Sequence, residues 1–332
     1  TIKPYISNDK MRNSLFVAID GGGSKSAVMV VSKDGNILYN FEAGPLNIVS
    51  IGKSRFIDNL ARIKHHIRAS FLLKDIEGYC LSLAGASRFK KKIYKLAASL
   101  LNNNVYIITD IEASFLAATK GEDGIIVSSG TGSFAYGKRG EDTARAGGWG
   151  YLVGDEGSAY WIGRETLRYI FMAHDGRKEK TELYYQILQN LNTNNIEEAI
   201  PMIYSRYKTP KKMARFSQIT CKMAEKGDRI ALEIIDEASE HLFNLVKAVS
   251  KRLFKETDNI VSVYGTGSVI KNCEILAQNL KQKIETRLPK HKFSICKTPD
   301  VVGAIIYYLQ QTQTSMEIIN KIETQIQTLF KQ

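Results

Sequence analysis

Residues 14–32 read SLFVAIDGGGSKSAVMVVS, and this stretch indicates the class of the fold. An apolar run ends in the acid Asp20, three glycines follow, and a second apolar run begins after Lys25. Short runs rich in Val and Ile are typical of buried strands, and glycines between them permit a sharp turn. The segments GIIVSSGTGSFAYG (124–137) and NIVSVYGTGSVIKN (259–272) repeat the same pattern.

Strand-like and helical patterns alternate along the rest of the chain. Further apolar runs lie at 36–44, 78–87 and 104–110, and apolar residues at helical spacing lie at 55–73, 230–254 and 268–280. This alternation predicts an α/β fold with mixed central sheets, and the turn KDGN at 33–36 predicts an antiparallel part. The near-identical turns SGTGS (129–133) and YGTGS (264–268) suggest an imperfect internal repeat of related half-structures.

The chain is long enough for two lobes, and the pattern breaks at ATKGEDG (118–124). We therefore predict an N-terminal lobe at 1–118, in which the polar residues 1–13 form a tail. A larger C-terminal lobe is predicted at 119–332. Its last segment, 311–332, has apolar residues on one helical face, so we expect a closing helix packed on a lobe or on a partner chain. A homodimer is the expected assembly.

Composition limits the classes of partner. The chain has 46 Lys and Arg against 34 Asp and Glu, a net charge of +12. The densest basic groups, at 87–95, 206–215 and 251–256, lie far apart and form no basic stripe studded with aromatic residues. Nucleic-acid binding is therefore not expected, although a positive field would attract an anionic nucleotide. No apolar run reaches the roughly 18–20 residues that span a bilayer, and the polar start lacks a signal peptide, so we expect a cytoplasmic protein.

The cysteines and histidines give no sign of a metal centre. The four cysteines are scattered, with no CxxC motif: Cys80, Cys221, Cys273 and Cys296. A zinc site or a disulfide framework is therefore not expected. The adjacent residues His65 and His66 would not share a helix face.

The first glycine turn contains residue types that can bind phosphate. Backbone N–H groups of Gly22 and Gly23 and the side chains of Ser24 and Lys25 could surround phosphate oxygens. Asp20, at the end of the strand, could hold Mg²⁺ through water, because Mg²⁺ keeps most of its water and takes few carboxylates. An ordinary glycine-rich turn explains the same letters equally well, and the ending and spacing of a P-loop are absent.

The other two turns strengthen the phosphate interpretation. Thr131 and Gly132 of the second turn could close on the same phosphates. The third turn precedes a predicted helix, whose free N–H groups favour polar or negative ligand groups, and it consists of Gly265, Thr266, Gly267 and Ser268. One such turn could be structural, but three at strand ends favour a nucleotide-binding site.

The segment GGWGYLVGDEGSAYWIG (147–163) combines glycines with both tryptophans of the chain and an acid pair. Together with DGGGSK (20–25), ITDIEAS (108–114), SSGTGS and YGTGS, it resembles the BadF/BadG-type ATPases, which include the N-acetylglucosamine kinases. The resemblance covers roughly residues 14–310. It implies two ribonuclease-H-like lobes of the actin-like ATPase fold, with ATP bound in a cleft between them.

The resemblance also implies roles for single residues. Asp110 matches the general base that accepts the proton of the sugar 6-hydroxyl, although an aspartate at a strand–helix junction could also be a simple N-cap. Ser217 falls where related kinases line the adenine pocket. The residues that match sugar contacts are Asn47, Gly148, Trp149, Gly150 and Asp155. Asn47 could instead be a turn residue, and Glu156, in the first turn of a helix, and Trp161 are expected to be structural.

The predicted function is transfer of phosphate from ATP, with Mg²⁺, to the 6-hydroxyl of N-acetyl-D-glucosamine. A glucosamine kinase with the same catalytic residues is the main alternative, since the sequence does not say whether the pocket takes an acetamide or an ammonium. Family members that activate other enzymes hold an iron–sulfur cluster with closely placed cysteines, and no two cysteines here are close in sequence. The zinc motif of the repressor-related sugar kinases is also missing. A nucleotide sensor would need neither a base nor a sugar pocket.

Overall fold

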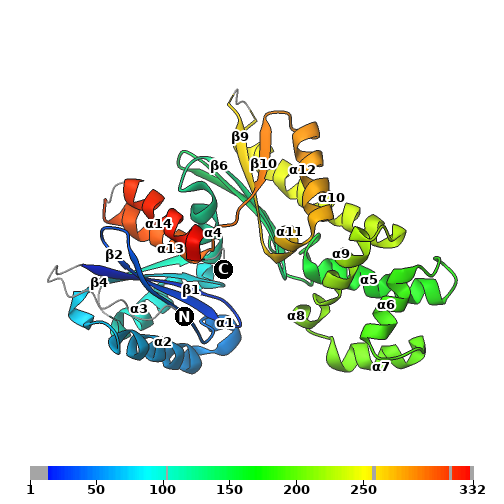
Figure 1. Ribbon diagram of the computed structural model, residues 1–332, viewed down its shortest axis with the longest axis horizontal. Coiled ribbons are helices and arrows are strands. Elements are labelled where there is room, and N and C mark those ends of the chain that lie inside the picture. The colour runs from blue at the N-terminus through cyan, green and yellow to red at the C-terminus, as the bar shows by residue number, and fades with distance from the viewer. Residues whose placement is uncertain (1–13, 102–103, 256–258, 314–315, 330–332) are drawn as a thin grey trace. The chain divides into compact units, whose positions relative to one another are not determined.

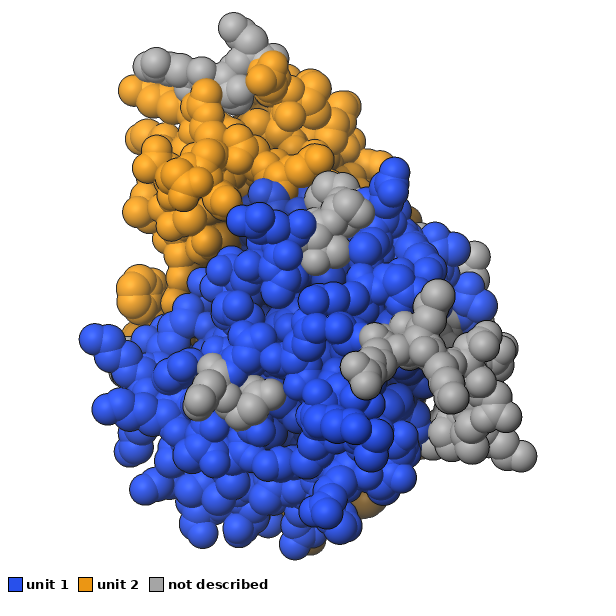
Figure 2. Space-filling view, turned by 90° about the vertical axis from the view of Figure 1, so that its left-hand side faces the viewer, with its two compact units in different colours: residues 1–121, 298–332 blue, residues 122–297 orange. Residues whose placement is uncertain are grey.

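The computed structural model describes residues 14–101, 104–255, 259–313 and 316–329 (Figure 1). The chain divides into two compact units, coloured separately in Figure 2. Unit 1 comprises residues 1–121 and 298–332, and unit 2 comprises residues 122–297. The predicted tail at 1–13 lies outside the described residues. No helix in the described part of the chain is long and apolar enough to cross a membrane.

Unit 1 is built on a five-stranded mixed sheet. Its strands are β1 (Leu15–Gly21), β2 (Ser26–Ser32), β3 (Ile37–Ala43), β4 (Ile76–Leu83) and β5 (Val105–Thr109). The order across the sheet is β3-β2-β1-β4-β5. Strands β1, β2 and β3 pair antiparallel, whereas β1, β4 and β5 run parallel. The carboxyl ends of three parallel strands therefore meet at one edge of the sheet, where open α/β sheets bind ligands.

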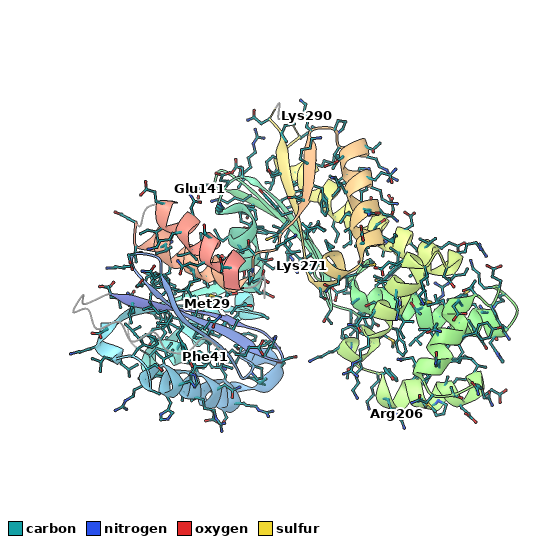
Figure 3. All side chains as sticks on the ribbon, in the orientation of Figure 1. Met29, Phe41, Glu141, Arg206, Lys271 and Lys290 are labelled. Carbon is teal, nitrogen blue, oxygen red and sulfur yellow. The ribbon has the colours of Figure 1, made fainter. Side chains whose placement is uncertain are left out.

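Helices cover both faces of this sheet. They are α1 (Ile48–Ile51), α2 (Lys53–Arg68), α3 (Lys90–Leu100), α4 (Asp110–Thr119), α13 (Val301–Gln311) and α14 (Met316–Leu329), with short 3₁₀ turns at Leu73–Asp75 and Ala86–Arg88. Phe56, Leu60 and Ile63 of α2 follow helical spacing and are buried on one face. Met29 and Phe41, labelled in Figure 3, belong to opposite layers, Met29 to the layer of α13 and Phe41 to that of α2.

The C-terminal helices belong to unit 1, whereas the sequence assigned all of residues 119–332 to one C-terminal lobe. Helices α13 and α14 return to the first sheet, where α13 packs on α4 and β1. Ile319, Ile322 and Ile326 of α14 are buried in the same layer. The closing helix therefore covers the sheet of unit 1, because its apolar face completes that core.

Unit 2 repeats the sheet of unit 1. Its strands are β6 (Gly124–Ser129), β7 (Ser133–Arg139), β8 (Asp142–Gly147), β9 (Val261–Thr266) and β10 (His291–Ile295). Their order is β8-β7-β6-β9-β10, which matches β3-β2-β1-β4-β5 of unit 1 strand by strand. The matching pairs of strands also run in the same relative directions. Strand order thus makes β6 the counterpart of β1. The turns SGTGS and YGTGS, read as marks of two half-structures, instead end the neighbouring strands β6 and β9 of a single unit.

A helical insertion separates β8 from β9 in unit 2. The helices of this unit are α5 (Ala159–His174), α6 (Glu182–Asn190), α7 (Ile196–Arg206), α8 (Pro210–Met213), α9 (Phe216–Glu225), α10 (Arg229–Leu253), α11 (Ser268–Asn272) and α12 (Glu274–Arg287). Asp228 caps α10, whose apolar stripe is buried against the sheet. The predicted α/β class with mixed central sheets is confirmed, and each sheet has five strands.

Candidate active site

The carboxyl edge of the unit 1 sheet holds the first predicted site residue, Asp20. Asp20 lies directly opposite Ser82 of the neighbouring parallel strand β4. The Ser82 hydroxyl donates a hydrogen bond to Asp20 Oδ1 at 3.0 Å. The sequence did not single out Ser82, because its contact with Asp20 follows from the pairing register of strands that are 62 residues apart.

The electrostatic surroundings of Asp20 favour its neutral form. Burial, then the nearby carboxylate of Asp300, and to a smaller extent that of Asp110, raise the pKa of Asp20 from 3.8 to about 7, against the effect of the Ser82 hydrogen bond. Such a carboxylate is stabilised as an anion when a cation comes close. Among the residues that the structure describes, no three His, Cys, Asp or Glu side chains are arranged to hold a metal ion directly.

Asp110 lies at the same edge of the sheet, one strand further along. Leu83 of β4 is opposite Thr109, the last residue of β5, and Asp110 begins α4. The N-cap of α4 is Thr109, whose Oγ1 accepts the N–H of Glu112 at 3.1 Å, while Glu112 Oε2 accepts the N–H of Thr109 at 2.7 Å. This capping box satisfies the helix terminus without the Asp110 side chain. The interpretation of Asp110 as an N-cap is therefore wrong, because Thr109 performs that function.

Helix α13 brings the third acid to this edge. A Cβ atom on Gly303 would lie 1.9 Å from the carbonyl oxygen of Ala113, so only glycine allows α13 and α4 to cross so closely. Both residues lie in the first turn of their helices. The crossing therefore places Asp300, just before α13, near the beginning of α4. Asp300 carried no signal in the sequence, since its position depends on packing between helices about 190 residues apart.

The first glycine turn closes on itself. The N–H of Gly22 donates to the carbonyl of Lys25 at 3.0 Å, and the carbonyl of Gly22 accepts the N–H groups of Leu46 and Asn47. Gly23 and Ser24 form the exposed tip of the turn. The exposed side chain of Lys25, predicted to bind phosphate, forms an ion pair with Glu42 of β3. This pair is solvent-exposed on both sides and thus weak enough to open for an anionic ligand.

Asn47 combines the two roles considered for it. It is the N-cap of α1, and its Oδ1 accepts the N–H groups of Val49 at 3.0 Å and Ser50 at 3.4 Å. The side-chain amide NH₂ is not used by this cap, because a cap uses only the carbonyl oxygen. Asn47 can therefore cap the helix and still donate to a ligand.

In unit 2 the second glycine turn and the tryptophan–glycine segment form one structure. A Cβ atom on Gly132 would lie 2.9 Å from the carboxylate oxygens of Asp155, and the N–H of Ser133 donates to Asp155 Oδ1 at 3.3 Å. The N–H of Ala159 donates to the carbonyl of Gly130 at 2.9 Å. Thr131 lies at the tip of this turn, between two anchored glycines.

Asp155 is strained and buried. Its φ of 63° is unusual for a residue other than glycine, and its side chain is buried against Gly132. Burial raises the pKa of Asp155, while the hydrogen bond from the Ser133 N–H opposes that shift. Backbone strain of this kind persists only where the surrounding structure enforces it, and it clusters at functional sites.

Trp149 is an exposed aromatic residue flanked by glycines. Its side chain is 71% exposed, and the guanidinium carbon of Arg145 lies 5.3 Å from the ring centroid. Arg145 also donates to the carbonyls of Gly147 and Gly148, and Gly148 and Gly150 both have positive φ angles. Gly148 is further held by a 2.8 Å hydrogen bond from its N–H to the carbonyl of Ser133.

The end of this segment differs in one respect from the prediction. The Ser158 hydroxyl accepts the N–H of Trp161 at 3.2 Å, so Ser158 caps α5 and Glu156 precedes the helix instead of lying in its first turn. The prediction for Glu156 was wrong because the serine, a preferred N-cap residue, starts the helix. Trp161 is confirmed as structural: it is 4% exposed and packs edge-on against His241.

The third glycine turn lies next to the second. A Cβ atom on Gly267, whose φ is 84°, would lie 2.3 Å from the carbonyl oxygen of Ser129, so glycine is required at this position. Gly265 is similarly enclosed by Phe293. The Thr266 hydroxyl is buried and has no hydrogen-bond partner among the described residues. Ser268 begins α11.

A cavity of about 580 Å³ in unit 2 brings three of the predicted nucleotide-binding residues together. We call it the unit-2 pocket, and it is lined by Thr131, Ala159, Lys211, Ala214, Arg215, Ser217, Gln218, Cys221, Lys222, Glu225, Ser268, Val269, Asn272 and Cys273. Thr131, Ser217 and Ser268 come from the second turn, from α9 and from the third turn. Three cationic side chains against one acid in the lining suit an anionic ligand, and the volume is in the usual range for small-molecule sites.

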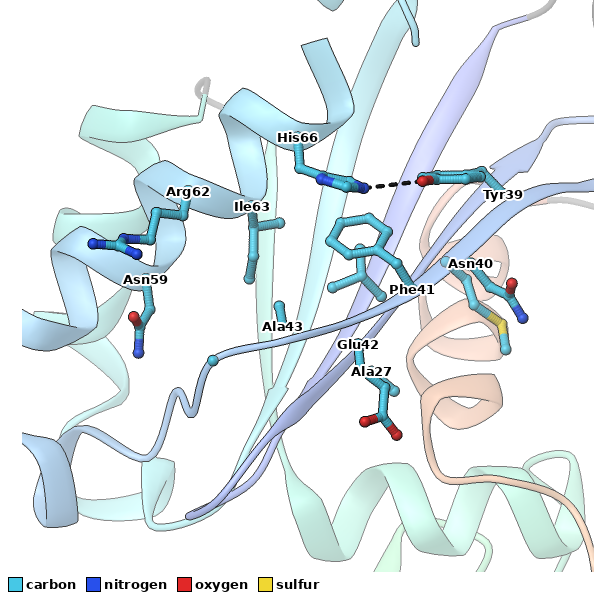
Figure 4. A pocket seen from close by; sticks show the side chains of 13 residues that line it. Ala27, Tyr39, Asn40, Phe41, Glu42, Ala43, Asn59, Arg62, Ile63 and His66 are labelled. Atoms are coloured by element: carbon cyan, nitrogen blue, oxygen red, sulfur yellow. Dashed lines mark hydrogen bonds between the residues drawn. The ribbon is translucent and has the colours of Figure 1, made fainter. Parts of the chain in front are cut away.

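A second cavity, of about 650 Å³, lies between β3 and α2 of unit 1 (Figure 4). Tyr39 and Phe41 point toward His66, and a 3.0 Å hydrogen bond joins the Tyr39 hydroxyl to His66 Nε2. None of the residues predicted to bind ATP or sugar lines this cavity. It is therefore separate from the site described above.

Comparison with known proteins identifies the family of this chain. Residues 17–305 match the model of the BadF/BadG/BcrA/BcrD ATPase family. The chain belongs to this family. The match includes all three glycine turns, Asp110 and the tryptophan–glycine segment, so the resemblance noted in the sequence is confirmed.

Individual relatives are amino-sugar kinases. The chain is 32% identical over 300 residues to the N-acetylmuramic acid/N-acetylglucosamine kinase of Clostridium acetobutylicum, covering 87% of this chain and 96% of the relative. It is 27% identical over 317 residues to the N-acetyl-D-glucosamine kinase of Dictyostelium discoideum, covering 90% and 99%. Its fold matches a crystal structure of a proposed N-acetylglucosamine kinase from Chromobacterium violaceum with a TM-score of 0.68 at 22% identity, covering 89% and 99%.

Proposed function

We propose that this chain is an ATP-dependent amino-sugar kinase that phosphorylates the 6-hydroxyl of N-acetyl-D-glucosamine. The observation that carries the proposal is the position of Asp110. It lies at the carboxyl edge of parallel strands, and Thr109 caps the helix in its place. A carboxylate on the first residue of a helix, at a ligand-binding sheet edge, in a family whose relatives are amino-sugar kinases, suits a general base.

The proposed chemistry needs one proton transfer and one phosphoryl transfer. The oxygen of the sugar 6-hydroxyl attacks the γ-phosphorus of ATP, and Asp110 accepts the proton of that hydroxyl. The bond from the γ-phosphorus to the oxygen that bridges it to the β-phosphate breaks. Positioning and charge stabilisation supply most of the catalysis in such reactions. The backbone N–H groups of Gly23 and Gly132 and the side chains of Ser24, Lys25 and Thr131 are the donors we assign to the phosphates.

Asp20 is the residue we assign to Mg²⁺, held through water. Its raised pKa reflects a buried carboxylate close to two other acids, a site that a cation would stabilise. A single carboxylate fits the preference of Mg²⁺ for retained water better than a cage of protein ligands would. When bound, Mg²⁺ would neutralise charge on the transferred phosphoryl group. Ser82 orients Asp20 through its hydrogen bond.

We assign the unit-2 pocket to the nucleoside part of ATP. Ser217 and Ser268 lie in its wall, and Ser268 directly follows residues 265–267 of the third glycine turn in the chain. The Ser217 hydroxyl donates to the carbonyl of Ala214 at 2.7 Å, so this side chain shapes the wall more than it offers a free donor. The lining cations Lys211 and Arg215 would attract the anionic ligand.

The sugar is assigned to Asn47, Asp110 and the segment around Trp149. Gly148 and Gly150 permit close approach of the backbone, and Trp149 offers an exposed ring face on which a sugar can stack. Asp155 holds the second glycine turn and can accept a hydrogen bond from a sugar hydroxyl with its remaining lone pairs.

A second substrate is favoured by one specific observation. Arg145 lies over the Trp149 ring, and its charge reaches Asp155. A guanidinium beside the proposed sugar site could pair with the carboxylate of N-acetylmuramic acid, the other substrate in the name of the Clostridium relative. Glucosamine is the third candidate. An activator of another enzyme is less consistent with the structure, because Cys221 and Cys273 are buried and cannot present a cluster to a partner.

Two properties of the protein stay predictions. A homodimer is expected, and light scattering of the purified chain would measure it. A cytoplasmic location is expected, and cell fractionation would measure it.

The test is release of ADP from Mg·ATP with N-acetylglucosamine, N-acetylmuramic acid, glucosamine and glucose supplied separately, beside a control without sugar. Fast release with N-acetylglucosamine and formation of its 6-phosphate by NMR are expected. Arg145→Gln should lower kcat/KM for N-acetylmuramic acid at least about tenfold more than for N-acetylglucosamine, since only the acid needs the ion pair. Release of ADP that does not depend on any sugar would overturn the proposed function.

A further inference from the structure

Two cysteines that are far apart in the sequence meet in unit 2. Cys221 lies on α9, and Cys273 is the residue between α11 and α12. Helices α9 and α12 pack against each other, both cysteines line the same pocket, and each thiol shifts the pKa of the other. The sequence predicted no cysteine pair, because 52 residues separate the two and only the packing of α9 on α12 joins them.

The pair lies in the wall of the unit-2 pocket. Cys221 is 7% exposed and Cys273 is 1% exposed, yet both line the pocket together with Thr131 and Ser268. A reagent small enough to enter the pocket would therefore meet both sulfur atoms. Larger reagents, and proteins, would not reach them.

The two thiols differ in reactivity. The interaction between them lowers the pKa of Cys273 and raises that of Cys221. Cys273 therefore becomes the thiolate first, and the thiolate is the nucleophile in thiol chemistry. The positive side chains of Arg215 and Lys222 also line the pocket. Cys80 offers a contrast inside the same chain: it is fully buried in unit 1, and burial raises its pKa.

We propose that Cys221 and Cys273 are an oxidation site, which a peroxide entering the empty nucleotide pocket converts into a reversible disulfide. The Cys273 thiolate attacks one peroxide oxygen, the O–O bond breaks, and the departing hydroxide takes up a proton to form water. Cys221 loses its proton and attacks the sulfur of the Cys273 sulfenic acid, which releases a second water. The two thiols are oxidised and the peroxide is reduced, so two thiols and one peroxide give one disulfide and two waters.

The disulfide would change the pocket. It would fix α9 to the beginning of α12 through a sulfur–sulfur bond of about 2.05 Å. Both helices contribute to the wall, so the linked form should bind nucleotide more weakly, and bound nucleotide should protect the thiols. This consequence rests on the assignment of the unit-2 pocket to ATP, whereas formation of the disulfide does not.

The experiment treats the full chain with hydrogen peroxide, blocks remaining thiols with N-ethylmaleimide and maps tryptic peptides by mass spectrometry. Cleavage after Arg215, Lys222, Lys271 and Lys281 yields peptides 216–222 and 272–281, each with one of the two cysteines. We expect these peptides to be linked, and the link to disappear with dithiothreitol. A non-hydrolysable ATP analogue at ten times its Kd should slow formation of the link about tenfold, because only the free pocket reacts.

Matched variants make the result specific. Cys221→Ser and Cys273→Ser should each abolish the linked peptide, whereas the double variant with Cys80→Ser and Cys296→Ser should form it as the parent does. Thermal melting of each variant checks that it folds. Where a serine variant does not fold, the alanine variant at the same cysteine replaces it. Failure to find the linked peptide in the folded parent would overturn the proposal.

Experiments with added nucleotide analogue separate this proposal from the proposed function. A link that forms equally fast with saturating analogue would overturn the claim that the pair lies in the nucleotide pocket. If calorimetry detects no nucleotide binding, the proposed function fails, and the link without nucleotide still decides whether the pair is an oxidation site.

Discussion

The sheets of the two units share one strand order but have different side chains at the same place. Asp20 of β1 lies opposite Ser82 of β4, and the corresponding pair in unit 2 is Ser128 of β6 opposite Thr266 of β9. Unit 1 therefore has a carboxylate where unit 2 has a hydroxyl. The surroundings follow the same division, since Asp110 and Asp300 join Asp20 in unit 1, whereas cations line the unit-2 pocket.

This difference shows how one architecture can divide a reaction. An acidic edge can accept a proton and hold a cation, whereas the glycine turns, which both units carry, and the cations of the unit-2 pocket can bind the anionic ligand. The shared strand order explains why both edges lie at carboxyl ends of parallel strands. The side chains, and not the topology, assign the chemistry to each unit.

The largest expected effect is on the acidic edge. Asp110→Asn should lower turnover about 100-fold or more, because asparagine cannot accept the proton of the sugar hydroxyl. The melting temperature should hardly change, since Thr109 and Glu112 form the cap. Steady-state kinetics with N-acetylglucosamine and calorimetry measure both.

Glu112→Gln is the matched control for Asp110. Glutamine preserves the capping box and removes a negative charge two residues away, so turnover should stay close to that of the parent. Turnover of Asp110→Asn within about threefold of the parent would remove the assignment of Asp110 as base.

The second effect is on the unfolding free energy, which the buried Asp20 carboxylate lowers when it is charged. The folded state raises the pKa of Asp20 from 3.8 to about 7, so it holds a proton that the unfolded state has lost. The unfolding free energy therefore falls as pH rises from about 4 to about 7, and the full cost applies above that range. Asp20→Asn removes the charge and should be more stable than the parent at pH 8 by up to about 4 kcal/mol, with the gain vanishing below pH 4.

Asp34→Asn is the control with the opposite sign. The hydrogen bond from Ser32 lowers the pKa of Asp34, so its charge is favoured in the folded state and its loss should not stabilise the protein. Denaturant titrations at pH 4 and pH 8 measure both variants. A gain for Asp20→Asn that is equal at the two pH values would mean that charge burial is not its cause.

The third effect compares the two tryptophans. Trp149→Ala should raise KM for the sugar about tenfold and leave KM for ATP unchanged, because the exposed ring contributes a binding surface and little to the core. Trp161→Ala should instead lower stability by about 3–5 kcal/mol, since that ring is buried. If Trp149→Ala raises both KM values equally and lowers the melting temperature, the role of Trp149 is structural, like that of Trp161.

The sequence predicts the local parts of this comparison well. Apolar runs ended by glycine turns identified β1, which carries Asp20, and β6 and β9, whose following turns carry Thr131 and Gly267, because a strand and its turn are encoded locally. The family resemblance pointed to Asp110, and the alternating pattern predicted the α/β class.

What the sequence could not predict depends on long-range packing. Ser82 and Asp300 reach the site through strand register and through the crossing of α13 over α4, which no local pattern encodes. The same packing returns residues 298–332 to unit 1. Cys221 and Cys273 meet for the same reason, and the matching turns at 129–133 and 264–268 end neighbouring strands instead of marking two halves.

The smallest expected effects are changes in unfolding free energy at the paired strand positions where the two units differ. In unit 1 the Ser82 hydroxyl has Asp20 as its partner, whereas the buried Thr266 hydroxyl of unit 2 has no partner among the described residues. Ser82→Ala should destabilise the protein by about 1 kcal/mol at pH 8, because the Asp20 carboxylate loses its donor. Thr266→Val should stabilise it by up to about 1 kcal/mol, because a buried hydroxyl without a partner gives way to a methyl group of the same shape. Denaturant titration measures both signs. If Thr266→Val is destabilising, the hydroxyl has a partner, and the two edges are more alike than their side chains indicate.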